Sequence, residues 1–410
     1  MKILHLSTND FGGAGSAALR IHNACLKNNL QSLLIVKNKT TRSNNAFSSN
    51  SKNIISKIKL FLNRVIIKIF YKYDYFMYSL FESDFQNVDE ILTRTNFKPD
   101  HIILHWTAGF INLDEIIALK KKYGCNVYQY LMDLSPITGG CHYANGCENF
   151  SSGCFNCPAS KTFDLSQLSS KRLSSQFEKH KELDTCFLSP NFNFKQYIDK
   201  SIYKGFKSNN LYIPIDESIF NRKKDLKENK FKILFGARNI KDKRKGWNYF
   251  KEAILYFDQI AKNENLSKKI EIIVPGMDSS NFFEGKYFYF KETKLATNEK
   301  DLSKIYQKVD LFINCSIQDA GPMMISESLM SGVPVISFDV GICSEVIKDF
   351  KNGFVVNKFN SRKISEKILF FSKLNENDLE NYKEESRNVA INFCSNSSFS
   401  DQLKQILRVR

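Results

Sequence analysis

The chain has 410 residues, more than one hydrophobic core usually supports, so its length predicts two or three domains. Hydrophobic residues make up 42% and charged residues 25% of the sequence, which excludes disorder along the whole chain. The net charge of +16 favours an anionic partner, although a solvated basic surface would also give this excess.

The beginning of the chain, MKILHLSTNDFGGAG, has an apolar run too short for a signal peptide, which predicts a cytoplasmic protein. No uncharged apolar stretch of about 18 residues occurs, so no segment is expected to span a membrane. Basic stretches are not interleaved with aromatic residues on a recognisable RNA or DNA module. A nucleic acid is therefore not an expected partner.

Apolar strand patterns alternate with helical patterns along the N-terminal half. Strands are predicted at residues 2–6 and 32–36 around a helix over 16–27, and again at 101–105 and 126–131. This succession is typical of a parallel sheet covered by helices.

One helical segment of this half is both amphipathic and basic. Its apolar residues recur every three or four positions, at Ile54, Ile58, Leu62, Val65, Ile69 and Tyr73. The basic residues Lys57, Arg64, Lys68 and Lys72 fall largely elsewhere on the helix. The pattern fits a helix lying on an anionic membrane surface, and it also fits an ordinary helix packed on the sheet with a solvated basic face.

A second series of strands is predicted at residues 231–236, 269–275, 310–314, 333–338 and 353–356. Two such series predict an α/β fold with two Rossmann-like, doubly wound parallel-sheet domains facing a central cleft. We place the first domain at 1–205 and the second at 206–390, with the joint in the polar stretch 209–230. A C-terminal helix at 391–410 is expected to pack back on the first domain.

The glycines after the first strand could hold a phosphate. Gly13, Gly15 and Ala18 fit the pattern G-x-G-x-x-[GA], in which backbone amides at a helix N-terminus bind a diphosphate. A dinucleotide site would have an acidic residue at the end of the second strand, where Lys37 and Asn38 stand, so NAD and FAD are disfavoured. Neither a P-loop nor an Asp-x-Asp metal motif occurs, so side-chain cations and amides would have to hold a diphosphate.

Two stretches of the second half offer such groups. FGARNIKDKRKGW places Arg238, Arg244 and Lys245 after the first strand of the domain, as a phosphate site or as a solvated basic loop. DAGPMMISESLMSGVPVISF places Asp319 in a loop and Glu327 on the helix that follows. Carboxylates and loop amides at these positions could bind the hydroxyls of a sugar and a ribose, or Asp319 could simply cap the helix.

Residues 213–356 resemble the nucleotide-binding domain of family 4 retaining glycosyltransferases, which have the GT-B fold. The family signature Glu-x7-Glu reads Asp-x7-Glu here, with Asp319 at the first position and Glu327 at the second, where the family binds the ribose. The resemblance implies that Arg238 and Lys245 grip the donor diphosphate, with Arg244 beside them. It also implies donor contacts from the loop and helix start at Gly321, Pro322, Met323 and Met324.

In the first half, FGGAG matches the glycine loop of the family, which implies that Gly13 is an amide donor, and LHW at His105 resembles an acceptor-side loop. YLMDLSPITGGCHYANGCENFSSGCFNCP resembles a colanic-acid-type subgroup of bacterial polysaccharide glycosyltransferases, whose motif begins with His-Asp. Here Met132 precedes Asp133. The backbone carbonyl of Met132, Asp133, His105 or His142 would have to substitute for the missing histidine.

Four cysteines cluster in the loop 132–160, at Cys141, Cys147, Cys154 and Cys157. Four thiolates at these separations could hold a structural zinc ion, with His142 as a substitute ligand, or they could be free or oxidised thiols. No cofactor is expected for catalysis itself.

The resemblance implies a retaining glycosyltransferase that moves a sugar from a nucleoside-diphosphate sugar to a glycan acceptor. The expected acceptor is lipid-linked, in the synthesis of lipopolysaccharide, O-antigen or capsule, and the expected location is cytoplasmic, peripheral at the inner face of the membrane. The expected catalytic residues are Asp319, Glu327, His105 and Asp133. The alternative is a noncatalytic GT-B-fold scaffold subunit, suggested by Asp319 and Met132 where the family has Glu and His.

Overall fold

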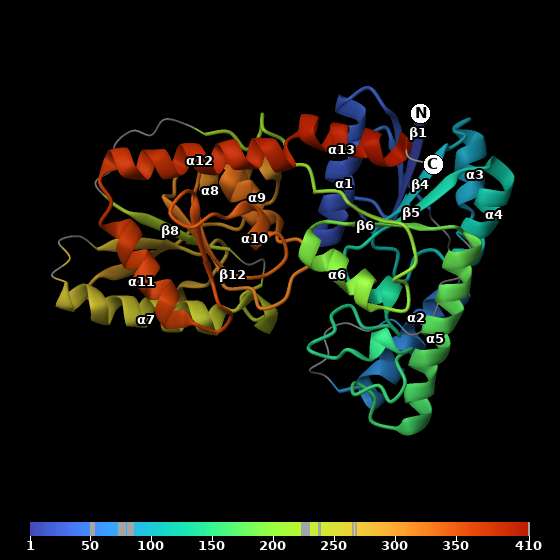
Figure 1. Ribbon diagram of the computed structural model, residues 1–410, viewed down its shortest axis with the longest axis horizontal. Helices are drawn as coiled ribbons and strands as arrows, with labels where there is room; N and C mark the ends of the chain where they lie inside the picture. The colour runs from blue at the N-terminus through green and yellow to red at the C-terminus, as the bar shows by residue number, and fades with distance from the viewer. Residues whose placement is uncertain are drawn as a thin grey trace. The chain divides into compact units, whose positions relative to one another are not determined.

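The computed structural model describes residues 1–49, 54–72, 79, 86–222, 230–236, 239–264, 266 and 269–408. The chain divides into two compact units (Figure 1). Unit 1 comprises Met1–Ile213 and Ser400–Arg410, and unit 2 comprises Pro214–Phe399. The end of the chain thus belongs to the same unit as its beginning.

Unit 1 is built on a parallel sheet with the strand order β3-β2-β1-β4-β5-β6-β7. Its strands are β1 (Lys2–Asn9), β2 (Gln31–Asn38), β3 (Ala46–Ser48), β4 (His101–Leu104), β5 (Asn126–Tyr130), β6 (Cys186–Ser189) and β7 (Ser208–Asn210). Its helices are α1 (Gly12–Lys27), α2 (Ile54–Phe70), α3 (Val88–Arg94), α4 (Leu113–Tyr123), α5 (Phe163–Glu182), α6 (Phe192–Lys200) and most of α13 (Asn396–Arg408), with short 3-10 turns η1 (Ser135–Ile137) and η2 (Asn149–Ser151).

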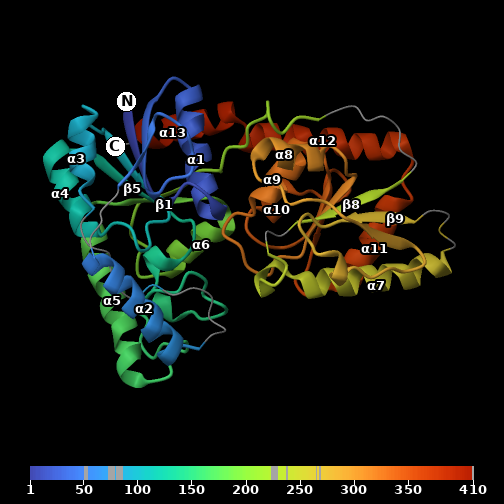
Figure 2. The ribbon, with the colours of Figure 1, turned by 180° about the vertical axis from the view of Figure 1, so that it is seen from behind.

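The central strands of unit 1 are buried on both faces, which is why they read as continuous apolar runs in the sequence. α1 packs against β1 (Figure 2). The chain turns from β2 and β3 on one side of β1 to β4 and β5 on the other, so the strand order reverses between β1 and β4. In parallel α/β sheets, the crevice at such a point, outside the carboxyl ends of the strands, is the usual ligand site.

Unit 2 is built on a second parallel sheet with the strand order β10-β9-β8-β11-β12-β13. Its strands are β8 (Lys232–Phe235), β9 (Ile270–Ile273), β10 (Phe288–Lys291), β11 (Leu311–Asn314), β12 (Val335–Phe338) and β13 (Gly353–Val356). Its helices are α7 (Trp247–Asn263), α8 (Glu299–Tyr306), α9 (Met323–Met330), α10 (Cys343–Val346), α11 (Ser361–Ser372) and α12 (Glu376–Cys394), with the 3-10 turns η3 (Lys243–Lys245) and η4 (Ser279–Asn281).

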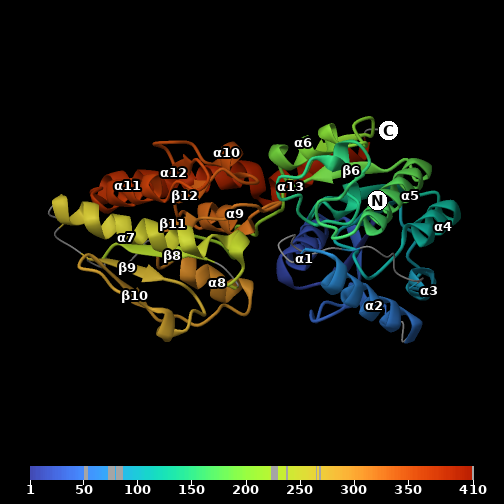
Figure 3. The same ribbon diagram turned by 90° about the horizontal axis from the view of Figure 1, so that it is seen from below.

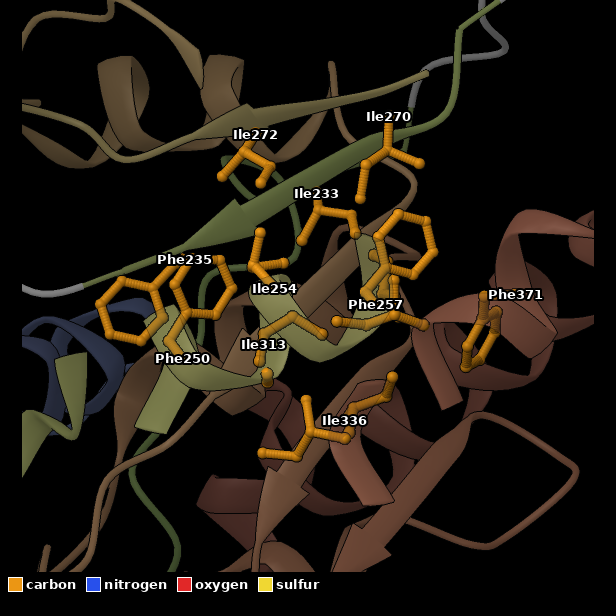
Figure 4. Close-up of a cluster of buried hydrophobic side chains, with 14 of the residues drawn as sticks. Ile233, Phe235, Phe250, Ile254, Phe257, Ile270, Ile272, Ile313, Ile336 and Phe371 are labelled. Atoms are coloured by element: carbon orange, nitrogen blue, oxygen red, sulfur yellow. The ribbon is translucent and has the colours of Figure 1, made fainter. Parts of the chain in front are cut away.

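A single apolar cluster joins this sheet to the helices over one of its faces. Figure 4 shows Ile233 of β8 and Ile313 of β11 close to Ile254 and Phe257 of α7, and all four side chains are fully buried. α11 lies beside α7 (Figures 1 and 3). Full burial of such a side chain stabilises the fold by about 1.5–3 kcal/mol, so this layer holds β8 and β11 rigidly. The strand order reverses between these two strands.

The two predicted Rossmann-like parallel sheets are confirmed, and each predicted strand overlaps an observed one. The sequence patterns missed β3, β6, β7 and β10, which have only three or four residues. β7 lies partly within the stretch predicted as the interdomain joint. The described helices include none that is long and apolar enough to cross a membrane.

Candidate active site

The loops after β8 and β11 meet at one edge of the unit 2 sheet, because these parallel strands are neighbours. The backbone N–H of Ile317 donates a hydrogen bond to the carbonyl oxygen of Arg244 at 2.8 Å. Gly246 adopts a φ of 71°, and a Cβ there would lie 1.9 Å from the carbonyl oxygen of Cys315. Glycine is therefore required at 246 for the two loops to come this close.

This approach brings together two of the predicted donor-binding residues. The Nζ atom of Lys245 lies 2.6 Å from Oδ2 of Asp319, and Asp319 Oδ1 accepts a hydrogen bond from the N–H of Gly321 at 3.3 Å. The ion pair orients a cation at the carboxyl end of the sheet, where a ligand's phosphate would compete with the carboxylate for it.

Asp319 does not cap the helix that follows it. α9 begins at Met323 with Pro322 in the capping position, and no side chain accepts a capping hydrogen bond there. The interpretation of Asp319 as a helix cap is therefore wrong.

Arg244 is engaged within its own turn. Its Nη2 atom lies 2.6 Å from Oδ2 of Asp242, whose Oδ1 accepts the backbone N–H of Arg244 at 3.0 Å. Arg238 lies outside the described residues. Of the three predicted cations, Lys245 is thus the one that the structure pairs with the acidic loop residue Asp319.

Glu327 is buried on the second turn of α9. Its Oε2 atom accepts a hydrogen bond from the hydroxyl of Tyr306 at 3.0 Å, and that hydroxyl lies 3.2 Å from the carbonyl oxygen of Met324. Tyr306 ends α8 and is fully buried, so it holds the carboxylate in one orientation. Sequence reasoning missed Tyr306, because no motif distinguishes it from an ordinary apolar residue of that helix.

The loop and helix start between Asp319 and Glu327 hold the remaining predicted donor contacts, Gly321, Pro322, Met323 and Met324. This segment packs tightly on two glycines. A Cβ at Gly236 would lie 1.8 Å from Cε of Met324, and a Cβ at Gly341, whose φ is 56°, would lie 2.6 Å from Cδ of Pro322. Gly341 thus lets the backbone around Pro322 approach the loop after β12, whereas at Gly236 the end of the Met324 side chain fills the space beside β8.

In unit 1, Gly13 lies in the first turn of α1. Nothing lies within 4 Å of a Cβ placed on Gly13, whereas a Cβ on Gly15 would lie 2.6 Å from the carbonyl oxygen of Asn9. Gly15 thus serves the packing of α1 on β1, and Gly13 leaves open space beside the first helical turn. No side chain accepts a capping hydrogen bond at this helix N-terminus.

His105 is buried beside His5 on the neighbouring strand. Nε2 of His105 lies 3.0 Å from Nδ1 of His5, and the ring of His22 lies edge-on to His5. Burial, reinforced by His22, lowers the pKa of His105 to about 3. His105 is therefore a neutral core side chain at physiological pH, and its ring faces other histidines.

These buried histidines predict acid-sensitive stability. Burial lowers the pKa of His22 to about 4, and that of His5 also lies well below 6.5. The unfolded chain takes up these protons near pH 6.5, so the unfolding free energy should fall as the pH decreases from about 6.5 to 4, by up to about 1.4 kcal/mol per pH unit for each histidine. Thermal melts across this range measure the slope, which His105→Gln should reduce. An unchanged slope would contradict the assignment.

Asp133 and His142 form a buried pair. Oδ2 of Asp133 lies 2.5 Å from Nδ1 of His142, the indole N–H of Trp106 lies 3.2 Å from the same nitrogen, and Nε2 of His142 lies 2.9 Å from Oγ of Ser79. Burial alone would raise the pKa of Asp133, but His142 and the hydrogen bonds from Ser135 outweigh it, so the pKa lies below its usual value. The carboxylate of Asp133 therefore stays charged. Asp133 and His142, two of the candidates to substitute for the missing histidine, are thus paired with each other.

None of the four clustered cysteines forms a disulfide bond in the described part of the chain. The N–H of Gly139 donates to Sγ of Cys154 at 3.2 Å, and the N–H of Asn149 donates to Sγ of Cys147 at 3.5 Å. Burial raises the pKa of Cys141 and Cys154 to about 12, which favours neutral thiols. Within the described ranges, no three His, Cys, Asp or Glu side chains are grouped so as to hold a metal ion. The structural zinc stays a prediction that metal analysis of the purified chain can test.

Part of unit 2 matches a known protein family. Residues 217–389 match the family model described as Glycosyl transferases group 1, and this range includes Lys245, Asp319 and Glu327. No curated protein matches the sequence.

Solved structures resemble the whole chain at low identity. Anabaena HepE in complex with UDP-glucose has a TM-score of 0.65 at 11% identity, covering 99% of both chains. S. aureus TarM, as a mutant in complex with Fondaparinux, alpha-GlcNAc-glycerol and UDP, has a TM-score of 0.62 at 11% identity, covering 100% of both chains. WaaG, a glycosyltransferase involved in lipopolysaccharide biosynthesis, has a TM-score of 0.59 at 11% identity, also covering 100% of both chains. Most of unit 2 therefore matches a glycosyl transferases group 1 domain, and the chain has the two parallel-sheet Rossmann-like domains of the GT-B fold.

Proposed function

We propose that the chain is a retaining glycosyltransferase that moves a sugar from a nucleoside-diphosphate sugar to a glycan acceptor in bacterial surface polysaccharide synthesis. One observation carries the proposal: Lys245, Asp319 and the buried Glu327 lie on the two adjoining loops and the helix at the carboxyl end of the unit 2 sheet. The domain match over these residues supports it, as do the UDP-glucose of HepE and the UDP of TarM.

The site offers groups suited to this chemistry. Breaking the glycosidic bond of the donor leaves negative charge on the β-phosphate, and the preoriented ammonium of Lys245 would stabilise that charge. Glu327, held by Tyr306, would accept hydrogen bonds from the ribose diol. Retention needs no enzyme nucleophile in this scheme, because the leaving phosphate can take the proton from the acceptor hydroxyl on the same face of the sugar.

The experiment is a screen of nucleoside-diphosphate sugars, first by thermal stabilisation and then by release of the nucleoside diphosphate in the presence of saccharide acceptors. We expect one donor to be transferred, with the anomeric configuration of the donor retained in the product by NMR. An inverted product would overturn the retaining mechanism. Binding of a donor without hydrolysis or transfer would favour the noncatalytic scaffold subunit.

We also propose that α2 places the protein on an anionic membrane, which would bring it to a lipid-linked acceptor. Part of the apolar stripe recognised in the sequence faces solvent, with Ile58, Leu62 and Ile69 exposed by 52%, 49% and 54%. Ile66 and Ile67 instead pack against Tyr71 and Ala159. A helix packed on the sheet by its stripe would bury these three side chains, so their exposure supports the membrane interpretation.

The charge of α2 favours an anionic surface as the occupant of this face. The helix contains no acidic residue, and its basic residues Arg64 and Lys68 are exposed. The C-terminal end of the helix is anchored to the rest of unit 1, because the N–H of Lys72 donates to the carbonyl of Ala159 and the N–H of Lys161 donates to the carbonyl of Phe70, both at 2.9 Å. The stripe is thus held outward on a supported helix.

Replacing Ile58, Leu62 and Ile69 together by serine should reduce binding to phosphatidylglycerol-containing vesicles by tenfold or more, since each buried apolar side chain contributes about 1.5–3 kcal/mol. Arg64→Gln with Lys68→Gln should weaken binding about fivefold per cation and make it less sensitive to salt. Flotation assays measure both. Leu255→Ser, at an exposed leucine on α7, is the matched control. Unchanged flotation of the triple variant would contradict a membrane contact. A triple variant that disrupts self-association of the chain rather than vesicle binding would contradict it as well.

A further inference from the structure

The C-terminal half of α2 packs on the cysteine-rich loop. A small apolar cluster is centred on two buried residues, Tyr71 just after α2 and Ala159 in the loop. The partly buried residues packed against these two are Ile66, Ile67, Cys141, Cys157 and Leu168. Two of the four clustered cysteines thus lie against the same pair of residues that supports α2.

The backbone is held in place at both of these cysteines. The carbonyl oxygen of Cys141 accepts a hydrogen bond from Oγ1 of Thr138 at 2.8 Å. The N–H of Cys157 donates to Oγ of Ser166 at 2.5 Å, and Ser166 belongs to α5. Cys157 is therefore fixed to a long helix of unit 1, and its position beside the apolar cluster is set by the fold.

The other two thiols of the cluster contribute to the shape of the loop itself. Sγ of Cys154 accepts the N–H of Gly139, and Sγ of Cys147 also accepts a backbone N–H. Cys154 has a φ of 59°, in the left-handed region that residues with a side chain seldom adopt. Cys141 and Cys157 are instead the pair that shares an apolar environment next to α2.

The four thiols are close enough to affect one another's ionisation. Burial raises the pKa of Cys141 to about 12, and the charge of Cys157 contributes to the increase. Burial likewise raises the pKa of Cys147 and Cys154, and the charge of Cys157 contributes to both. No three metal-ligating side chains are grouped around an ion site in the described ranges, but a disulfide needs only two thiols.

We infer that Cys141 and Cys157 are the site of a reversible disulfide that locks the support of α2. The oxidant is a low-molecular-weight disulfide such as oxidised glutathione. Cys157 reacts first, because burial suppresses the thiolate of Cys141: its Sγ attacks the oxidant, forms a mixed disulfide and releases one glutathione thiolate. Sγ of Cys141 then attacks Sγ of Cys157 and releases the second glutathione. The leaving thiolates take up the two protons that the cysteines lose, so two cysteine thiols are oxidised and one glutathione disulfide is reduced.

Closing this bond would hold the end of α2 more firmly. Residues 159–161 come shortly after Cys157, and they exchange backbone hydrogen bonds with Phe70 and Lys72 at the end of the helix. A disulfide that closes the loop from residue 141 to 157 restricts the unfolded chain and so favours the folded loop. Because α2 is the helix that we propose to bind the membrane, the disulfide would link that contact to the thiol redox state around the protein.

The test compares the full chain in reduced and in oxidised glutathione, without nucleotide or vesicles. Remaining thiols are blocked with N-ethylmaleimide, and digestion with trypsin and Glu-C separates Cys141 from Cys157 at Glu148. We expect mass spectrometry to find these two cysteines linked after oxidation and separated again by dithiothreitol. Oxidation should raise the melting temperature by about 5 °C and slow hydrogen exchange at the amides of Lys72 and Lys161 about tenfold.

Cys141→Ser and Cys157→Ser should each abolish these responses. Cys147→Ser, at another partly exposed thiol of the loop, is the matched control and should keep them. Mapping the linkage in the parental chain needs no variant, so it decides the question even if a serine variant fails to fold.

The inference is overturned if both cysteines stay reduced in oxidised glutathione, or if a different pair of cysteines is linked. It is also overturned if the linkage leaves hydrogen exchange at Lys72 and Lys161 unchanged, or if the purified chain holds a stoichiometric zinc ion on these thiols. None of these measurements involves sugar transfer. Their failure would leave the proposed function unaffected, and a chain without transferase activity would still give a clear result for the disulfide.

Discussion

Lys245→Ala is expected to lower the turnover of sugar transfer by about 100-fold or more, because removal of one preorganised group that stabilises developing charge costs about 3 kcal/mol. We expect a larger effect here than at Arg244, because the ammonium of Lys245 lies 2.6 Å from the carboxylate of Asp319 at the carboxyl end of the sheet. The measurement is kcat with the donor identified by the nucleotide-sugar screen. Transfer at the parental rate would show that Lys245 does not stabilise the leaving phosphate.

The same substitution also leaves Asp319 without its ion-pair partner, so the design must separate lost chemistry from a disturbed loop. Asp319→Asn keeps the cation and removes the pair, and we expect it to reduce turnover less than Lys245→Ala does. The double variant Lys245→Ala with Asp319→Asn should stay as slow as Lys245→Ala; recovery in the double variant would indicate a structural effect. Lys241→Ala changes an exposed lysine of the same loop and should leave turnover unchanged.

Glu327→Ala is expected to weaken binding of the nucleoside diphosphate about tenfold or more, because a hydrogen bond to a buried charged group contributes about 1.5–3 kcal/mol. Calorimetry with the free nucleotide measures this without any acceptor. Tyr306→Phe removes the donor that orients the carboxylate, and we expect a smaller loss from it. Glu366→Ala, at an exposed acid on α11, is the control. Equal affinity in the parent and Glu327→Ala would reject the ribose role.

The strand pattern of both domains could be predicted because central parallel strands are buried on both faces and must be apolar throughout. β10 and β7 escaped this reasoning for a physical reason. They are partly exposed edge strands of four and three residues. β7 (SNN) has no apolar residue, and the aromatic run of β10 (FYFK) is too short to distinguish a strand from another apolar stretch by its pattern. The donor residues Lys245 and Asp319 could also be proposed from the sequence, since both lie in loops that come after apolar strands.

Other features depend on contacts between residues far apart in the chain. The period of α2 predicts an amphipathic helix, but which side is buried depends on Ile66 and Ile67 meeting Ala159. A sequence pattern shows that apolar residues share a face, and it does not show whether that face is covered.

His105 illustrates the same limit at a candidate site residue. Its motif suggested an acceptor-side loop, but the parallel pairing of β1 with β4 brings its ring beside His5, 100 positions earlier. Burial there makes the ring neutral and removes it from solvent.

Local sequence was sufficient for most of the strands, for the glycine turns, and for the lysine and aspartate carried by the loops after β8 and β11, because each depends on residues close by in the chain. The partners of the buried carboxylates came from folding: Tyr306 for Glu327 and His142 for Asp133. Such pairings arise only when separate strands align in register and bring distant side chains within hydrogen-bonding distance.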